Sequence, residues 1–452
     1  MLKTVVLLAA FMVNFLGGSL GYSAGIIHLG LLKKFPEFSS EVAWAGSLFT
    51  SVFCLAGPIS SAVINTLSCR SALFIGSLLS FAGFLISSFA PRIEIILLCY
   101  GIVAGIGQSM VYSASVVVVG YYFHENPSVA TGVVVSGTGV GVTVFPIFTE
   151  FLLTTYGIDG AFLLLSAVSL QSCVFIMCIR THHLERRGGE RSHTLSWRIK
   201  MIAEDVYGIF LNRAFCFLCI SILCWSTSLN TSVLFLPQYY ISTGSSQWQA
   251  AFLMSLYGIM NCLSRTITGL AASDPNVDGK ILYMGSYFIL GLCTSFLPLT
   301  GASFAGKIFY SIILGLYSSG VWSLLTTISV EIVGLKHMST AFGIEMLTSG
   351  VGFLFGPIIG DSVKTQSRGY THVFVISGVV RLVAVRYLHL SSSNLSLIEP
   401  HHVYTTRSRA CGTPIHVPTL ARAWIHATTF HASQTCCRPS SIWCLLCDGG
   451  NV

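Results

Sequence analysis

Long apolar runs separated by short polar connections make up most of the first 390 residues of this chain. A helix crosses the hydrocarbon core of a bilayer, about 30 Å thick, with roughly 20 residues. The pattern therefore predicts an all-α, polytopic protein of the lipid bilayer. The runs of suitable length cover residues 5–29, 42–64, 72–90, 93–119, 129–153, 158–179, 214–241, 250–272, 281–300, 304–332 and 341–363.

A polar, basic stretch divides these runs into two groups. A twelfth run begins at His372, but Arg381 and Arg386 interrupt it, so we expect an incomplete last helix. Two-bundle secondary transporters have this layout and place their substrate site between the halves. The predicted organisation is an N-terminal bundle with spans 1–6 (1–179), a cytoplasmic loop (180–213), a C-terminal bundle with spans 7–12 (214–390) and an irregular tail (391–452).

Composition supports a membrane protein and excludes several other classes. Charged residues are only 9% of the chain, whereas soluble proteins carry about 25%. The net charge of +7 lies in connections and the tail, so it does not indicate a nucleic-acid partner. Most of the 15 cysteines lie inside apolar runs, where a free thiol behaves as a small hydrophobe.

The polar segments show no catalytic pattern and no metal-binding set. Two C-x-x-C pairs, Cys216/Cys219 and Cys444/Cys447, lack the further ligands of a closed zinc site. No Ser/His/Asp set or pair of carboxylates stands outside the apolar runs. We therefore expect a protein that is not an enzyme and that needs no cofactor or metal.

The Lys and Arg residues of the connections predict the orientation. If the N-terminus is cytoplasmic, the inner connections carry more of them than the outer ones, chiefly through the loop 180–213. Such an excess marks the cytoplasmic side. The first run is too long for the core of a signal peptide and contains Gly17, Gly18 and Gly21. The N-terminus is thus predicted to be cytoplasmic.

Arg265 is the clearest candidate for a substrate-binding residue. It lies deep in the eighth span, where an ionisable group costs several kcal/mol unless it is paired or faces a cavity. Its guanidinium forms a planar fork that binds a carboxylate with two hydrogen bonds. Asn261, one turn earlier, projects from the same helix face. The alternative is a structural arginine paired with a helix carbonyl or a carboxylate.

Other polar residues inside the spans are secondary candidates. Glu345, about a turn inside the eleventh span, could provide a counter-charge or coupling group for Arg265, or it could reach interfacial water. The remaining candidates either line a cavity or form helix–helix contacts. They are Asn14, Gln108, Asn230 and Trp322.

Glycines repeat at intervals of four residues in several spans. Such spacing places them on one helix face, where two backbones approach closely. The repeats are Gly101 and Gly105, Gly137 and Gly141, and Gly352, Gly356 and Gly360.

Several motifs recur at consistent spacing between about residues 17 and 375. Ser40-Glu41-Val42-Ala43-Trp44 precedes Gly57-Pro58, and Tyr122-Phe123 precedes Ala130, Gly132, Gly137 and Gly141. Residues 251–255, AFLMS, precede Asn261 and Arg265, and Gly356-Pro357-Ile358-Ile359-Gly360-Asp361 ends the eleventh span. In these motifs the chain resembles the monocarboxylate transporter family of the major facilitator superfamily.

The chain departs from the family pattern at positions that bear on coupling. The acidic signature of the first span would precede this chain, and Glu125-Asn126-Pro127 replaces a Lys-Arg-Arg. Proton-coupled members have a lysine where Tyr22 stands and an aspartate where Asn261 stands. The resemblance thus implies that the carboxylate-binding Arg265 is kept, while the groups that carry the proton are replaced.

The resemblance implies a major facilitator fold and a secondary transporter of small monocarboxylates or related organic anions. We expect alternating access in the plasma membrane, with facilitated diffusion or exchange in place of proton symport. Family members often need a single-span, immunoglobulin-type chaperone, which would be a partner here. Two alternatives are a carrier for neutral or aromatic solutes, such as amino acids or hormones, and a non-transporting isoform.

The tail after residue 390 has an unusual composition. It is rich in Thr, Ser, His, Cys and Arg, with no acidic residue between Glu399 and Asp448 and no periodicity. It resembles the product of a shifted reading frame, a retained intron or an alternative exon. The alternative is a divergent disordered tail.

Overall fold

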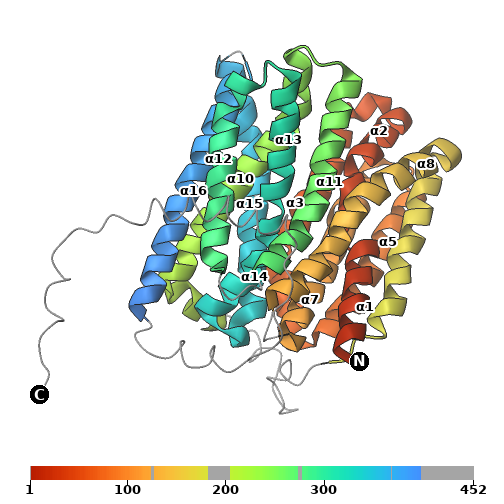
Figure 1. Cartoon of the computed structure of the whole chain (residues 1–452). Coiled ribbons are helices and arrows are strands. Elements are labelled where there is room, and N and C mark those ends of the chain that lie inside the picture. Colours follow the sequence, from red (N-terminus) through yellow and green to blue (C-terminus); the bar gives the residue numbers. More distant parts are fainter. Residues whose placement is uncertain (1, 124–126, 182–203, 273–276, 368, 399–452) are drawn as a thin grey trace, which may run out of the picture.

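The computed structural model describes residues 2–123, 127–181, 204–272, 277–367 and 369–398. Within these ranges the secondary structure is helical, with no strand. Figure 1 shows the helices in two groups that stand side by side, one from each half of the sequence. The polytopic all-α prediction is therefore confirmed.

The first group contains the helices of residues 2–176. They are α1 (Leu2–Leu16), η1 (Leu20–Ser23), α2 (Ala24–Lys34), η2 (Pro36–Phe38), α3 (Ser39–Leu55), α4 (Gly57–Thr66), α5 (Cys69–Ser88), α6 (Ile93–Ile96), η3 (Leu97–Ala104), α7 (Gly105–Tyr122) and α8 (Pro127–Ile176).

The second group follows a short helix at residues 204–211. It consists of α10 (Arg213–Ser242), α11 (Gln247–Ala271), α12 (Gly279–Thr300), α13 (Phe304–Ser318), α14 (Gly320–Val333), η5 (Leu335–His337), α15 (Met338–Ser367) and α16 (Thr371–Ile398).

The membrane spans correspond to the apolar runs. In the described chain, nine helices are long and apolar enough to cross a membrane, and the bent pair α3–α4 would make a tenth. One of the nine is α8, which is two helices joined at Gly157, where φ is 71°. The 25-residue α11 is more polar because it carries Asn261 and Arg265. Dividing α8 and adding α11 gives six segments on each side of the central loop.

The last helix is complete, so the expectation of an interrupted twelfth span is wrong. Helix α16 runs through both arginines to Ile398, past the boundary predicted at residue 390, and packs against α10 and α12. Arg381 is fully buried there and donates to the Ser228 carbonyl (3.3 Å) and to the hydroxyls of Ser232 (3.1 Å) and Thr294. These groups replace water around the guanidinium. Residues 182–203 of the predicted loop and 399–452 of the predicted tail lie outside the described chain.

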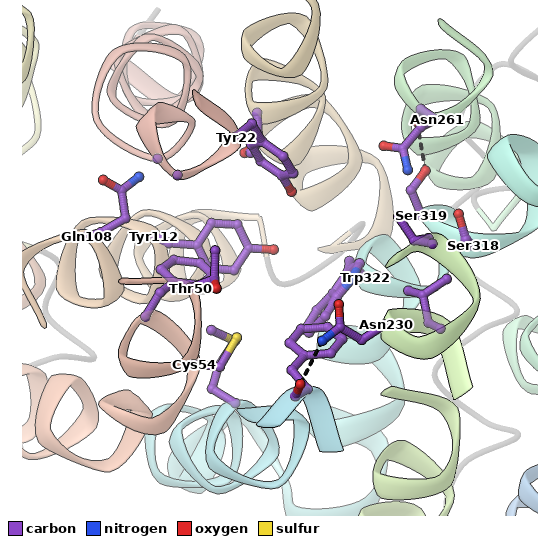
Figure 2. A pocket seen from close by; sticks show the side chains of 18 of the residues that line it. Tyr22, Thr50, Cys54, Gln108, Tyr112, Asn230, Asn261, Ser318, Ser319 and Trp322 are labelled. Atoms are coloured by element: carbon purple, nitrogen blue, oxygen red, sulfur yellow. Dashed lines mark hydrogen bonds between the residues drawn. The ribbon is translucent and has the colours of Figure 1, made fainter. Parts of the chain in front are cut away.

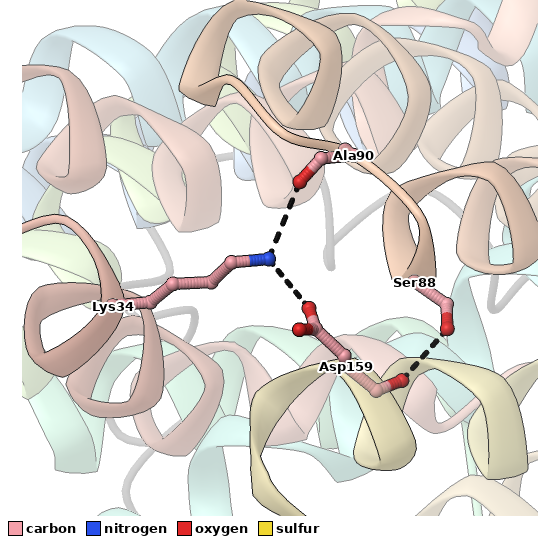
Figure 3. A network of polar contacts seen from close by, with 4 residues as sticks. All are labelled: Lys34, Ser88, Ala90 and Asp159. Carbon is pink, nitrogen blue, oxygen red and sulfur yellow. Dashed lines mark hydrogen bonds and ion pairs between the residues drawn. The ribbon is translucent and has the colours of Figure 1, made fainter.

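A polar network ties together the ends of three helical segments in the first half (Figure 3). The Lys34 ammonium lies 2.6 Å from a carboxylate oxygen of Asp159 and donates to the Ala90 carbonyl at 3.2 Å. The Ser88 hydroxyl donates to the Asp159 carbonyl at 2.8 Å. The network thus fixes the ends of α2 and α5 against the Gly157 turn of α8.

A few helices form the contact between the two halves, and they approach closely at small residues. Helix α11 packs against α8, and α15 packs against α3 and α4. A Cβ added at Gly132 of α8 would lie 2.9 Å from the Cα of Gly269 in α11. Near the end of the bundle that carries the N-terminus, Asn65 donates to the hydroxyl of Thr340 at 2.9 Å. The halves are therefore in direct contact on that side.

Candidate functional site

A cavity of about 280 Å³ lies between the two halves (Figure 2). Its polar and charged side chains come from both halves, and its walls are otherwise largely aromatic. Among the described residues that line it, Arg265 is the only charged one. The aromatic residues are Tyr22, Phe49, Phe53, Tyr112, Tyr257, Trp322 and Phe353.

Arg265 stands on α11 at the contact with α8. Its side chain is 4% exposed. One terminal nitrogen donates to the Val135 carbonyl at 3.1 Å, and the other donates to the Tyr22 hydroxyl at 3.4 Å. Both acceptors belong to the first half. No salt bridge joins Arg265 to a carboxylate within the described part of the chain, and its Nε has no hydrogen-bond partner there.

Three residues at intervals of four along α11 face this cavity: Tyr257, Asn261 and Arg265. The Asn261 side-chain amide donates to the Tyr257 hydroxyl at 3.4 Å, and the Asn261 backbone carbonyl accepts from the Ser319 hydroxyl at 2.7 Å. The spacing follows from the period of the helix, which places every fourth residue on one face. Tyr257 was not predicted, although the same spacing from Asn261 could have revealed it.

Tyr22, Asn230 and Trp322 line the cavity together with Arg265 and Asn261. Tyr22 projects from the short turn η1, and 47% of it is exposed. Asn230 on α10 donates to the Phe353 carbonyl at 2.6 Å. Trp322 on α14 packs edge-on against Trp225, with the ring centres 5.6 Å apart. The structure therefore brings these five residues to one cavity, together with the sequence candidate Gln108.

Asn14 and Glu345 lie outside the lining of this cavity. Asn14 is fully buried and donates to the Ser115 hydroxyl at 2.7 Å, which is a contact between α1 and α7. Glu345 is also fully buried and accepts from the Ser329 hydroxyl, which links α15 to α14. Both residues therefore form helix–helix contacts. From the sequence, such a contact is one alternative for Asn14 but not for Glu345.

The repeated glycines lie at close helix contacts. A Cβ added at Gly137 would lie 2.5 Å from the Phe11 carbonyl oxygen, and one at Gly141 would collide with the Ser19 side chain. In α15, an added Cβ would meet α10 at each of Gly352, Gly356 and Gly360. Pro357 lies inside α15 between the last two. These glycines set the distance between helices and do not touch the cavity.

Comparison with known proteins places the chain in a family. It matches the family model of the Major Facilitator Superfamily over residues 5–357. The chain therefore belongs to this superfamily, and the predicted fold class is confirmed.

Its relatives are carriers rather than enzymes, and they confirm the predicted resemblance. The chain is 27% identical to monocarboxylate transporter 2 of Rattus norvegicus, over 81% of this chain and 78% of that protein. It is also 27% identical to monocarboxylate transporter 12 of Rattus norvegicus, over 76% of each chain. Identity to monocarboxylate transporter 14 of Homo sapiens is 24%, over 85% of this chain and 89% of that protein.

Solved structures share the fold at low sequence identity. The fucose:proton symporter FucP of E. coli superposes with a TM-score of 0.68 at 12% identity, covering 86% of this chain and 99% of the symporter. The human organic anion transporter MFSD10 superposes with a TM-score of 0.68 at 15% identity, covering 85% of this chain and 99% of that transporter.

Proposed function

We propose that this protein is a secondary transporter of small monocarboxylates or related organic anions that works by alternating access. One observation carries the proposal: Arg265 is a buried cation that faces the cavity between the halves without a carboxylate partner in the described chain. A buried charge without a counter-charge is costly. A substrate carboxylate would supply that counter-charge and accept hydrogen bonds from the guanidinium fork.

The position of Arg265 also suits a carrier that moves its two halves. The residue belongs to α11 of the second half, but both of its hydrogen-bond acceptors belong to the first. A carboxylate that takes over these hydrogen bonds would weaken the link between α11 and α8. Binding and the relative movement of the two halves would then be coupled through a single side chain.

We propose facilitated diffusion or exchange without proton coupling. Tyr22 and Asn261, the two residues beside Arg265, are neutral, and the described cavity lining contains no Asp, Glu or His. Glu345 lies between α14 and α15 and does not line the cavity. The resemblance and the distribution of Lys and Arg support a plasma-membrane location with a cytoplasmic N-terminus. An immunoglobulin-type chaperone is a partner that the resemblance suggests.

Uptake of labelled L-lactate by proteoliposomes tests the anion requirement. Unlabelled lactate should inhibit this uptake at least about tenfold more strongly than lactamide, which has the same shape but no charge. Arg265→Gln should abolish uptake while the purified protein still elutes as a monodisperse species. Equal inhibition by lactamide, or normal uptake by the variant, would contradict the proposal.

Coupling is tested in the same vesicles with an imposed inward proton gradient. Uptake should be the same before and after a protonophore dissipates the gradient. Uptake that collapses with the gradient would show proton symport and overturn this part of the proposal.

A further inference from the structure

Gln108 is an unpaired amide in the wall of the cavity. It lies on α7, is 1% exposed, and both its oxygen and its nitrogen lack a hydrogen-bond partner in the described chain. Buried amide groups are nearly always hydrogen-bonded, because water satisfies them in the unfolded chain. Two unpaired atoms on one side chain that borders a cavity therefore indicate an amide whose hydrogen bonds a ligand would supply.

Gln108 and Arg265 face the same cavity from different halves of the molecule. One turn after Gln108 on α7 stands Tyr112, which lines the same cavity. Figure 2 shows Gln108 on one side of the cavity and Asn261 of α11 on the other. A ligand held by both Gln108 and Arg265 would span the interface between the halves.

Aromatic side chains form much of the cavity wall. Tyr112 packs edge-on against Phe53, with ring centres 5.5 Å apart, and Trp322 and Tyr257 complete the lining from the second half. Aromatic rings favour flat, apolar groups that stack against them. A cavity of about 280 Å³ is near the lower end of the range of ligand pockets, about 300–1,000 Å³, so the ligand is small.

We propose that Gln108 is a second substrate-recognition residue, and that the substrates are aromatic monocarboxylates carrying an uncharged group that donates and accepts hydrogen bonds, such as a hydroxyl or a carboxamide. This inference rests on the proposed function, because Arg265 must hold the carboxylate. An ammonium group fits less well: it only donates, so it would leave the Gln108 nitrogen unpaired. The described lining also has no acidic residue to balance it beside Arg265. Aromatic amino acids are therefore excluded from the preferred class.

Matched pairs of acids test the proposal in proteoliposomes. The three hydroxyphenylacetate isomers are each compared with the methylphenylacetate isomer, which has nearly the same shape but no hydrogen-bonding group. For at least one position of the ring, we expect half-saturation at about five- to tenfold lower concentration with the hydroxyl compound. Phenylalanine should compete less well than that hydroxy acid.

The variant Gln108→Leu should abolish the preference, so that the hydroxyl and methyl compounds reach half-saturation at the same concentration. Leucine is of similar size, and no hydrogen bond to the described chain is lost, so the fold should be retained. The matched control is Ser109→Ala, the next residue on α7, which is buried against Ser60 outside the cavity and should keep the preference.

The outcomes separate the two proposals. Equal half-saturation for hydroxy and methyl acids, stronger competition by phenylalanine, or a preference that survives Gln108→Leu would overturn the role of Gln108 while carboxylate transport stands. Absence of uptake for lactate and for every aromatic acid would overturn the proposed function and this inference with it.

Discussion

Arg265 and Arg381 are two buried arginines of the same half, and they differ in what surrounds them. Arg381 lies among α10, α12 and α16, where two hydroxyls and a carbonyl of its own half accept its hydrogen bonds. Arg265 lies between the halves, and its acceptors are a carbonyl and a hydroxyl of the other half. Only Arg265 borders the cavity. Burial of a charge alone therefore does not identify a binding residue, whereas its position relative to the interface of the halves does.

The largest effect is expected from Arg265→Met compared with Arg381→Met. Loss of a buried charge partner typically costs about 2–5 kcal/mol, so carboxylate uptake should fall by at least about 30-fold in the first variant. The second should retain uptake within about twofold. Initial rates in proteoliposomes, normalised to the reconstituted protein, give the measurement. Similar losses in both variants would show that the two arginines have the same structural role.

Asn261→Asp should make transport depend on pH. The introduced carboxylate lies one turn from Arg265 and, when ionised, pairs with it and competes with the substrate. Raising the pH ionises this group, so uptake should decrease from acidic to alkaline pH by roughly tenfold, whereas the wild-type rate stays nearly constant. Uptake measured over pH 5.5–8.0 without a gradient tests this. Uptake equal to that of the wild type at pH 8.0 would mean that a carboxylate at position 261 does not compete with the substrate for Arg265.

Arg381→Met should leave the stability unchanged or increase it. A buried charge replaced by an apolar side chain of similar volume often stabilises a protein, by about 1–4 kcal/mol. The partners of Arg381 also keep other acceptors, since Ser232 donates to Ser228 at 2.8 Å and Thr294 to Leu290 at 2.7 Å. Thermal unfolding in detergent measures the change. A marked fall in Tm would show that the guanidinium hydrogen bonds outweigh its desolvation.

The smallest effect is expected from Glu345→Gln. The amide oxygen can still accept from Ser329, and the residue does not line the cavity. Uptake should therefore change by less than about twofold, as for substitutions away from a site. A strong loss of uptake with normal expression would contradict this and support Glu345 as the coupling group for Arg265.

The sequence predicted the helical class, the two halves and the residues whose chemistry is conspicuous in a membrane. Arg265 and Asn261 could be found because charged and amide groups are rare in apolar spans. Tyr112 could not be distinguished from other aromatic residues, because the rotation of a helix about its own axis decides which of them face the cavity. The expectation that Arg381 interrupts the last helix failed, because hydroxyl groups on neighbouring helices accept hydrogen bonds from its guanidinium.

Two glycines of α8 govern how the halves touch. Gly132 lies against Gly269, and Gly139 lies against the backbone and the thiol of Cys262, so the backbones of α8 and α11 approach closely at these points. Side chains that interdigitate must change rotamer before two helices can slide past each other. A close contact between backbones needs no such change, so it adds little to the energy barrier. The barrier then depends on nearby hydrogen bonds, such as the one from Thr326 to Thr131 at 3.3 Å. We therefore expect larger residues at Gly132 and Gly139 to change the turnover number more than the affinity.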